Sequence, residues 1–254
     1  MRGRAVLPWR VALPRLLAVA VLLVAAQPRA LAGPPYLTDD PDPVDWQQWE
    51  IYIANLYQRL DGESSGSLPL VEVNYGIAPQ VELHSQIALD ADYSGYGAGG
   101  HHGLSDLELG VEWRFVTETD RRPEISCYPT LEIPTTQRGF SSSHAQLFLP
   151  VWAGKTMGRA TVYGGGGYWI NPGSGNRDYA FMGIATEVVL IGSWTAGGEL
   201  YHSTRAGTDI PAQSGFNLGS TVDLTNHLEV LASAGHSLGG PPLLTSYVGV
   251  RITF

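Results

Sequence analysis

The sequence predicts an all-β fold, a transmembrane, antiparallel, up-and-down β-barrel of about 12 strands. The first observation is a series of segments of about ten residues in which apolar and polar side chains alternate. The second is that only 15% of the 254 residues are charged, against about 25% in an ordinary soluble domain. Beyond residue 32, however, no apolar run approaches the roughly 20 residues that a spanning helix needs. The third is that short and long connections alternate along the chain, as they do in membrane barrels.

The first 32 residues read as a cleaved signal peptide. Four arginines within residues 2–15 precede the apolar run 16–26, and Ala30-Leu31-Ala32 supplies a small-residue cleavage site before Gly33. The alternative is a retained helical anchor. Cleavage would remove five arginines and no acids, which changes the net charge from −9 to −14. The segment 33–47 is then expected to be a periplasmic lead, and 48–254 to be the barrel.

The strands follow in order. The clearest is 106–115, where Asp106, Glu108 and Glu112 share one face and apolar residues such as Trp113 share the other. The same reasoning predicts strands at 48–60, 67–78, 80–90, 104–117, 124–133, 143–154, 159–170, 178–190, 194–203, 214–223, 228–236 and 244–254. In strand 143–154, Pro150 is expected to break the ladder or to mark a bulge.

The connections sort into two kinds. Tight turns are expected at 78–79, 119–123, 156–158, 192–193 and 225–226. Longer polar loops are expected at 61–66, 91–103, 134–142, 171–177, 204–213 and 237–243. One end of the barrel would therefore carry periplasmic turns, and the other would carry extracellular loops.

Aromatic residues gather at the short-turn end of their strands, as expected for a girdle at a membrane interface. They are Trp49, Tyr75, Trp113, Phe115, Trp194 and Phe254. The contrasting interpretation is a set of core aromatics in a soluble sandwich.

Ionisable residues fall on the opposite, lumen-facing side of the strands, because charges on a lipid-facing wall would be costly. They are Glu72, Glu82, His84, Glu108, Glu112, Arg114, Glu132, Glu187, Glu199 and Arg251. Two functions fit them. They could line a wet conduit that favours cations and neutral solutes, or they could form a hydrogen-bonded plug around Arg114 and Arg251 in a narrow barrel.

Several short motifs together resemble the transporter-like outer-membrane barrels grouped with the MetA-pathway phenol-degradation proteins. They are Thr38-Asp39-Asp40, Trp49-Glu50, Asn74-Tyr75-Gly76-Ile77, Gln80-Val81-Glu82-Leu83, Gly103-Leu104-Ser105-Asp106, the segment 129–135 and the segment 163–168. The resemblance implies a Gram-negative outer-membrane barrel that passes small, often hydrophobic or aromatic, molecules. The strand that ends in Phe254 also resembles the C-terminal signal that the barrel-assembly machinery recognises. Outer-membrane lipid and this machinery are therefore the expected partners.

Other functions receive less support from the residues. Nucleic acid is excluded as a partner because binding it requires a basic face. A lipid-acting enzyme would have to use His202 with Ser203 or His144 with Ser142. The acids Asp39, Asp40, Asp42 and Asp45 are expected to be a solvated segment, with weak Ca²⁺ binding as the alternative. No catalytic residue, metal ligand or cofactor is predicted, and a closed structural barrel stays open as an alternative function.

Overall fold

The computed structural model describes residues 34–93, 101–135, 140 and 142–254. The expected signal peptide and the middle of the expected loop 91–103 lie outside these residues. Within them the regular elements are strands. No helix in this part of the chain is long and apolar enough to cross a membrane.

Fourteen strand segments are present along the described chain. They are β1 (Trp49–Leu60), β2 (Glu63–Ala78), β3 (Val81–Asp92), β4 (His102–Leu104), β5 (Leu107–Val116), β6 (Glu124–Cys127), β7 (Thr130–Ile133), β8 (Gln146–Met157), β9 (Ala160–Ile170), β10 (Tyr179–Ile191), β11 (Trp194–Ser203), β12 (Gln213–Thr225), β13 (Leu228–Gly239) and β14 (Leu243–Thr253).

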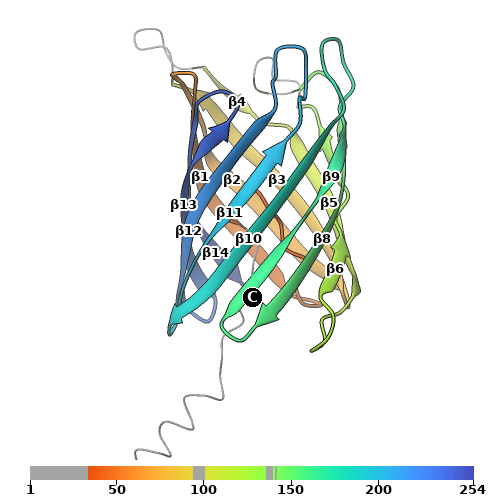
Figure 1. Cartoon of the computed structure of the whole chain (residues 1–254), viewed down its shortest axis with the longest axis vertical. Coiled ribbons are helices and arrows are strands. Elements are labelled where there is room, and N and C mark those ends of the chain that lie inside the picture. Colours follow the sequence, from red (N-terminus) through yellow and green to blue (C-terminus); the bar gives the residue numbers. More distant parts are fainter. Residues whose placement is uncertain (1–33, 94–100, 136–139, 141) are drawn as a thin grey trace, which may run out of the picture.

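These segments form a closed, twelve-stranded antiparallel barrel (Figure 1). Both β4 and β5 pair with β3, and both β6 and β7 pair with β5 and β8, so each of these couples is one wall strand with a break. The barrel closes where β1 pairs with β14 over eleven residues, from Glu50↔Thr253 to Leu60↔Leu243. The predicted fold class is confirmed.

Pro150 does not interrupt its own strand, because β8 runs through it without a break. The break lies in the neighbouring strand, between β6 and β7 at Tyr128 and Pro129. The Tyr128 amide still donates to the Pro150 carbonyl at 3.4 Å, but Pro150 has no N–H to return the bond. The missing donor therefore weakens the hydrogen bonding between β8 and the neighbouring β6–β7 strand, whereas β8 itself stays continuous.

Two of the expected long loops are short. The chain turns between β1 and β2 at Asp61 and Gly62, whose φ angles are 50° and 92°, as a two-residue hairpin turn requires. Likewise, β13 extends to Gly239 and β14 starts at Leu243. These strands extend beyond the residues in which apolar and polar side chains alternate, because the backbone of polar residues can also form the hydrogen bonds of a β-ladder. The connections 93–101, 134–145, 171–178 and 204–212 stay long.

The two faces of the wall have opposite character. On β5, Val111 and Trp113 are 41% and 53% exposed on the outside, whereas Glu112 between them is 4% exposed on the inside. All six predicted girdle aromatics lie on the surface at the short-turn end, where Trp49 packs on Tyr75 with ring centroids 4.4 Å apart. The outer wall is therefore apolar and the interior is polar.

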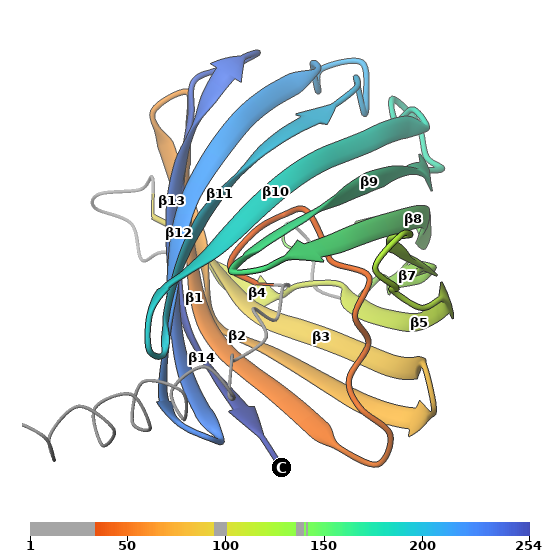
Figure 2. The same ribbon diagram turned by 60° about the horizontal axis from the view of Figure 1, so that its bottom comes forward.

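Residues 34–45 of the segment 33–47, which is expected to be a periplasmic lead, run inside the barrel (Figure 2). The backbone N–H groups of Leu37 and Thr38 donate to the carboxylate of Glu199, each at 2.8 Å. Because Glu199 lies in the middle of β11, the lead reaches about half the height of the barrel. Pairing of Trp46 with Gly76 then brings the chain back to the wall before β1 begins.

Candidate functional site

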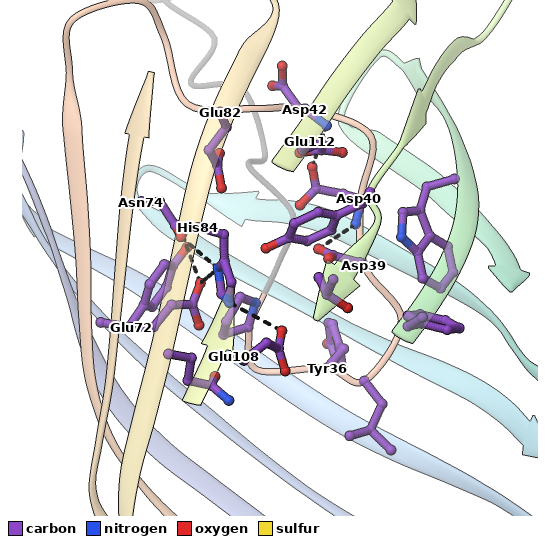
Figure 3. Close-up of a pocket in the computed structure, with 18 of the residues that line it drawn as sticks. Tyr36, Asp39, Asp40, Asp42, Glu72, Asn74, Glu82, His84, Glu108 and Glu112 are labelled. Atoms are coloured by element: carbon purple, nitrogen blue, oxygen red, sulfur yellow. Dashed lines mark hydrogen bonds and ion pairs between the residues drawn. The ribbon is translucent and has the colours of Figure 1, made fainter. Parts of the chain in front are cut away.

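The lumen holds a cavity of about 370 Å³ between the lead and the barrel wall (Figure 3). One side of it is lined by carboxylates, and these include Asp39 of the lead, Glu72 of β2 and Glu108 of β5. The other side is lined by aromatic rings on β8, β9 and β10. This cavity is the candidate functional site.

The ten predicted lumen residues all lie on the inner side of the wall, buried or half-buried. Five of them, Glu72, Glu82, His84, Glu108 and Glu112, line the cavity itself. The others do not line it: Arg114, Glu132, Glu187, Glu199 and Arg251 lie elsewhere in the lumen.

His84 is at the centre of the acidic side. Its Nε2 lies 3.2 Å from Glu108 Oε1, and its Nδ1 lies 2.8 Å from Asn74 Oδ1. Asn74 in turn donates through Nδ2 to Glu72 at 2.8 Å, so its oxygen faces the ring. Both ring nitrogens therefore face acceptors, and this arrangement favours the doubly protonated imidazolium.

Two of the predicted lumen acids hold the lead in place. Glu199 accepts hydrogen bonds from the Thr38 hydroxyl at 2.6 Å and from Asn217 Nδ2 at 2.6 Å, besides the two backbone bonds described above. Glu82 accepts a bond from the Val44 backbone N–H at 2.7 Å. Charged acceptors make the stronger class of hydrogen bond. The lead is therefore docked at specific positions.

The two arginines do not join the predicted acids in a single plug. Arg114 pairs with Asp42 of the lead and with Glu124, whose carboxylate is 2.7 Å away. Arg251 pairs with Glu229 at 2.8 Å and with Glu50 at 3.4 Å. Glu50, Glu124 and Glu229 are further lumen charges outside the predicted set, although strand alternation places all three on the inner face.

Two acids of the lead, Asp39 and Asp40, have raised pKa values. Burial raises the pKa of Asp39 to about 7, and the facing Glu72 adds to the rise. Burial also raises the pKa of Asp40 well above its ordinary value, with further contributions from Asp39 and Asp42. A carboxylate loses favourable hydration when it is buried, so its neutral form gains.

The aromatic side of the cavity was missed by the sequence analysis. Phe148 stacks on Trp169 with centroids 4.7 Å apart and an interplanar angle of 10°, and Trp152 and Phe181 pack at 6.4 Å. Phe148, Trp169 and Phe181 each lie within three residues of the long-loop end of their strands. The alternation of side chains within each strand could have placed these rings in the lumen. For Trp152, however, Pro150 made it ambiguous which face of the strand the side chain lies on.

Some buried polar atoms in the described lumen have no hydrogen-bond partner. They include Trp152 Nε1, which belongs to a residue that lines the cavity and is 1% exposed. Buried donors are normally paired, so such an atom indicates a place where a ligand or water supplies the acceptor.

Two of the four acids proposed as an alternative Ca²⁺ site make other contacts. Asp40 accepts a bond from the Asp42 backbone N–H at 2.7 Å, and Asp42 pairs with Arg114. In the described residues, no group of three or more His, Cys, Asp or Glu side chains is arranged to hold a metal ion.

The predicted Ser/His pairs are not joined side chain to side chain. Ser142 donates to the backbone carbonyl of His144, and Ser203 donates to that of Thr204. Instead, His202 Nδ1 lies 2.7 Å from the hydroxyl of Ser214 on the neighbouring strand. Both residues alternate with buried lumen residues, so this pair faces outward.

No family model matches the chain, and no curated protein matches it. The solved structures do show similar folds. KdgM porin in complex with disordered oligogalacturonate has a TM-score of 0.54 at 12% identity, over 80% of this chain and 99% of that chain. The translocator domain of the autotransporter NalP from Neisseria meningitidis has a TM-score of 0.54 at 11% identity, over 81% and 87%. The CymD monoaromatic hydrocarbon channel has a TM-score of 0.51 at 7% identity, over 83% and 89%.

These identities are too low to assign a shared activity, and the grouping with the MetA-pathway proteins gains no support from sequence comparison. The likeness in fold is nevertheless extensive, since each comparison covers at least 80% of this chain. The chain therefore has the fold of bacterial outer-membrane β-barrels.

Proposed function

We propose that this chain is an outer-membrane barrel that passes small molecules through its lumen, and that the lead 34–45 closes the lumen at rest. The observation behind this proposal is the cavity of about 370 Å³ inside a wall that is polar within and apolar outside. Pockets of roughly 300 to 1,000 Å³ are the usual size for small-molecule sites. The aromatic side of the cavity is consistent with hydrophobic or aromatic solutes.

The location follows from the same features. The apolar wall would contact outer-membrane lipid, and the strand that ends in Phe254 would be recognised by the barrel-assembly machinery. The signal peptide would direct export and would then be cleaved. Mass spectrometry of the protein isolated from outer membranes tests the last point, because cleavage predicts a chain that starts at Gly33.

Single-channel recording of the refolded protein in planar bilayers tests the conduit. We expect resolved, cation-selective steps whose selectivity falls when Glu108 and Glu112 are both changed to Gln, because their charges face the cavity. The replacement Glu63→Gln is the matched control, since Glu63 is an exposed acid at the end of β2. The absence of both conductance and solute uptake would favour a closed structural barrel.

The lead can be tested separately. Glu199→Gln keeps the side-chain volume but removes the negative charge of the carboxylate, which accepts four hydrogen bonds. We expect this variant to open more often than the wild type. Equal opening would show that the lead does not close the lumen.

One observation favours a second function, hydrolysis of lipid by the outward-facing His202 and Ser214. A histidine within hydrogen-bond reach of a serine hydroxyl is the arrangement that activates a serine nucleophile. Phospholipid hydrolysis by the refolded protein that disappears in both Ser214→Ala and His202→Ala would support this function. Unchanged or undetectable hydrolysis would remove it.

A further inference from the structure

The cavity has two unlike sides, and together they define the chemistry of a ligand. Its lining includes the carboxylates of Asp39, Glu72 and Glu108 but, among the described residues, no lysine or arginine. The two arginines of the lumen that lie beyond this lining are each paired with two acids: Arg114 with Glu124 and the lining residue Asp42, and Arg251 with Glu229 and the lining residue Glu50. A low-dielectric pocket with unbalanced carboxylates concentrates positive charge.

His84 does not balance this charge. Its two ring nitrogens are directed at Glu108 and at the Asn74 amide. His84 can therefore supply one positive charge at most, against the acids of three different elements. Those acids include Glu72 on β2, Glu82 on β3 and Asp39 on the lead. A cavity lined in this way favours a cation over an anion.

The opposite side is suited to a flat, apolar group. The ring of Phe148 lies parallel to that of Trp169 and packs edge-on with that of Phe181, and all three rings line the cavity. Rings of this kind stack on aromatic ligands, and they also attract cations through their negative faces. The unpartnered Trp152 N–H next to them lacks only an acceptor.

Building on the proposed function, we infer that the cavity binds a small organic cation that carries a ring and an oxygen, of the class of hydroxylated arylalkylamines. The ammonium would face Asp39 and Glu108, the ring would lie against Phe148 and Trp169, and the oxygen would accept the hydrogen bond of Trp152 Nε1. This orientation satisfies the carboxylates and the orphan donor at the same time.

Four commercially available molecules separate the contributions of the ammonium group and of the ring hydroxyl to binding. Tyramine has the ring, the hydroxyl and the ammonium; tyrosol replaces the ammonium by a hydroxyl; 4-hydroxyphenylacetate replaces it by a carboxylate; and phenethylamine lacks the ring hydroxyl. Binding to the refolded, full-length mature protein in detergent would be measured by calorimetry and by tryptophan fluorescence. We expect tyramine to bind at least about tenfold tighter than tyrosol, which corresponds to about 1.4 kcal/mol, and the carboxylate not to bind.

Two variants locate the ligand. Glu108→Gln should weaken tyramine about tenfold and leave tyrosol unchanged, whereas Glu63→Gln should change neither. Trp152→Phe should remove the advantage of tyramine over phenethylamine, because phenylalanine keeps the ring and lacks the N–H. Far-ultraviolet circular dichroism and heat-modified gel mobility would establish that each variant is folded.

The outcomes are distinguishable from those of the proposed function. Tyrosol or 4-hydroxyphenylacetate binding as tightly as tyramine would overturn the cation site, and so would a Glu108→Gln variant that binds tyramine normally. Conductance in potassium chloride without tyramine binding would remove this inference and leave the conduit. Tyramine binding without any conductance would remove the conduit and leave the binding site.

Discussion

Gly183 on β10 is a residue at which the lead comes close to the barrel wall. A Cβ atom placed there would overlap the hydroxyl of Thr38. Overpacking of this kind costs about 1–3 kcal/mol, and here the cost falls on the docked lead because β10 is held in the sheet on both sides.

Gly183→Ala is therefore expected to release the lead, which would be measured as more frequent opening in planar bilayers and as faster proteolysis of residues 34–45. Gly239→Ala is the control, since a Cβ there would have no neighbour closer than 4.0 Å. Unchanged proteolysis and opening in Gly183→Ala would contradict the docked position of Thr38.

Asp39 and Asp40 predict that docking depends on pH. The pKa of Asp39 is raised to about 7 in the docked lead by burial and by Glu72, and Glu108 adds to the rise while His84 opposes it. The pKa of Asp40 is raised by burial and by Asp39, Asp42 and Glu187. A raised pKa means that the docked lead binds protons more tightly than the released lead.

The contribution of Asp39 to docking is therefore complete below its ordinary pKa of 3.8 and is lost as the pH rises through about 7. We expect proteolysis of the lead to accelerate between about pH 4 and pH 7, and Asp39→Asn to flatten this dependence. A wild-type lead that becomes more protected as the pH rises would contradict the assignment.

At the scale of a single element, β9 depends on its run of four glycines, 164–167. A Cβ on Gly166 would overlap the Phe181 carbonyl of β10, and a Cβ on Gly167 would overlap the backbone of Pro150 on β8. The small residues therefore let β9 approach both neighbours closely, next to the aromatic side of the cavity.

Gly166→Ala should destabilise the barrel by about 1–3 kcal/mol because the clash is with backbone rather than with a flexible side chain. Urea unfolding followed by tryptophan fluorescence would measure the change, with Gly239→Ala again as the control. A stability equal to that of the wild type would mean that the close approach of β9 and β10 is wrong.

At the scale of the whole molecule, the outer wall predicts a dependence on depth in the membrane. Ile184 is 54% exposed near the middle of β10, and Ile191 is 72% exposed at the short-turn end of the same strand. An arginine on the lipid-facing side costs about 2–4 kcal/mol at the midplane and about 0–1 kcal/mol near the interface.

Ile184→Arg is therefore expected to lose several times more stability than Ile191→Arg when both are unfolded in urea from lipid vesicles. Equal losses would place the lipid midplane elsewhere on the wall. In lipid-free detergent the difference between the two variants should shrink, because detergent micelles adapt to a local charge.

Much of the barrel could be predicted from the sequence because strands have a period of two. Glu72, Glu112 and Glu187 were placed on the lumen side from alternation with their apolar neighbours, and the structure buries them there. An Asp-Gly pair such as Asp61-Gly62 is a strong hairpin signal, but the sequence prediction assigns residues 61–66 to a longer loop because polar residues follow the pair.

The lead could not be placed in this way. Its contacts join Thr38 to Glu199, 161 positions later, and Ser233 to the Pro35 carbonyl, 198 positions away. No local pattern records a contact of this kind. The partners of Arg114 and Arg251 were missed for the same reason, since pairing across a lumen depends on how the closed wall sets each side chain in three dimensions.

The sequence by itself determined the fold class, the number of wall strands and the face on which each strand carries its charges, because all three follow from local alternation and from the cost of charge in lipid. Only the tertiary structure decided what fills the lumen. Closure of the barrel brings the carboxylates of β2, β3 and β5 opposite the rings of β8, β9 and β10, and it gives the lead carboxylate acceptors to dock against. The low overall charge of the chain is thus explained by its wall.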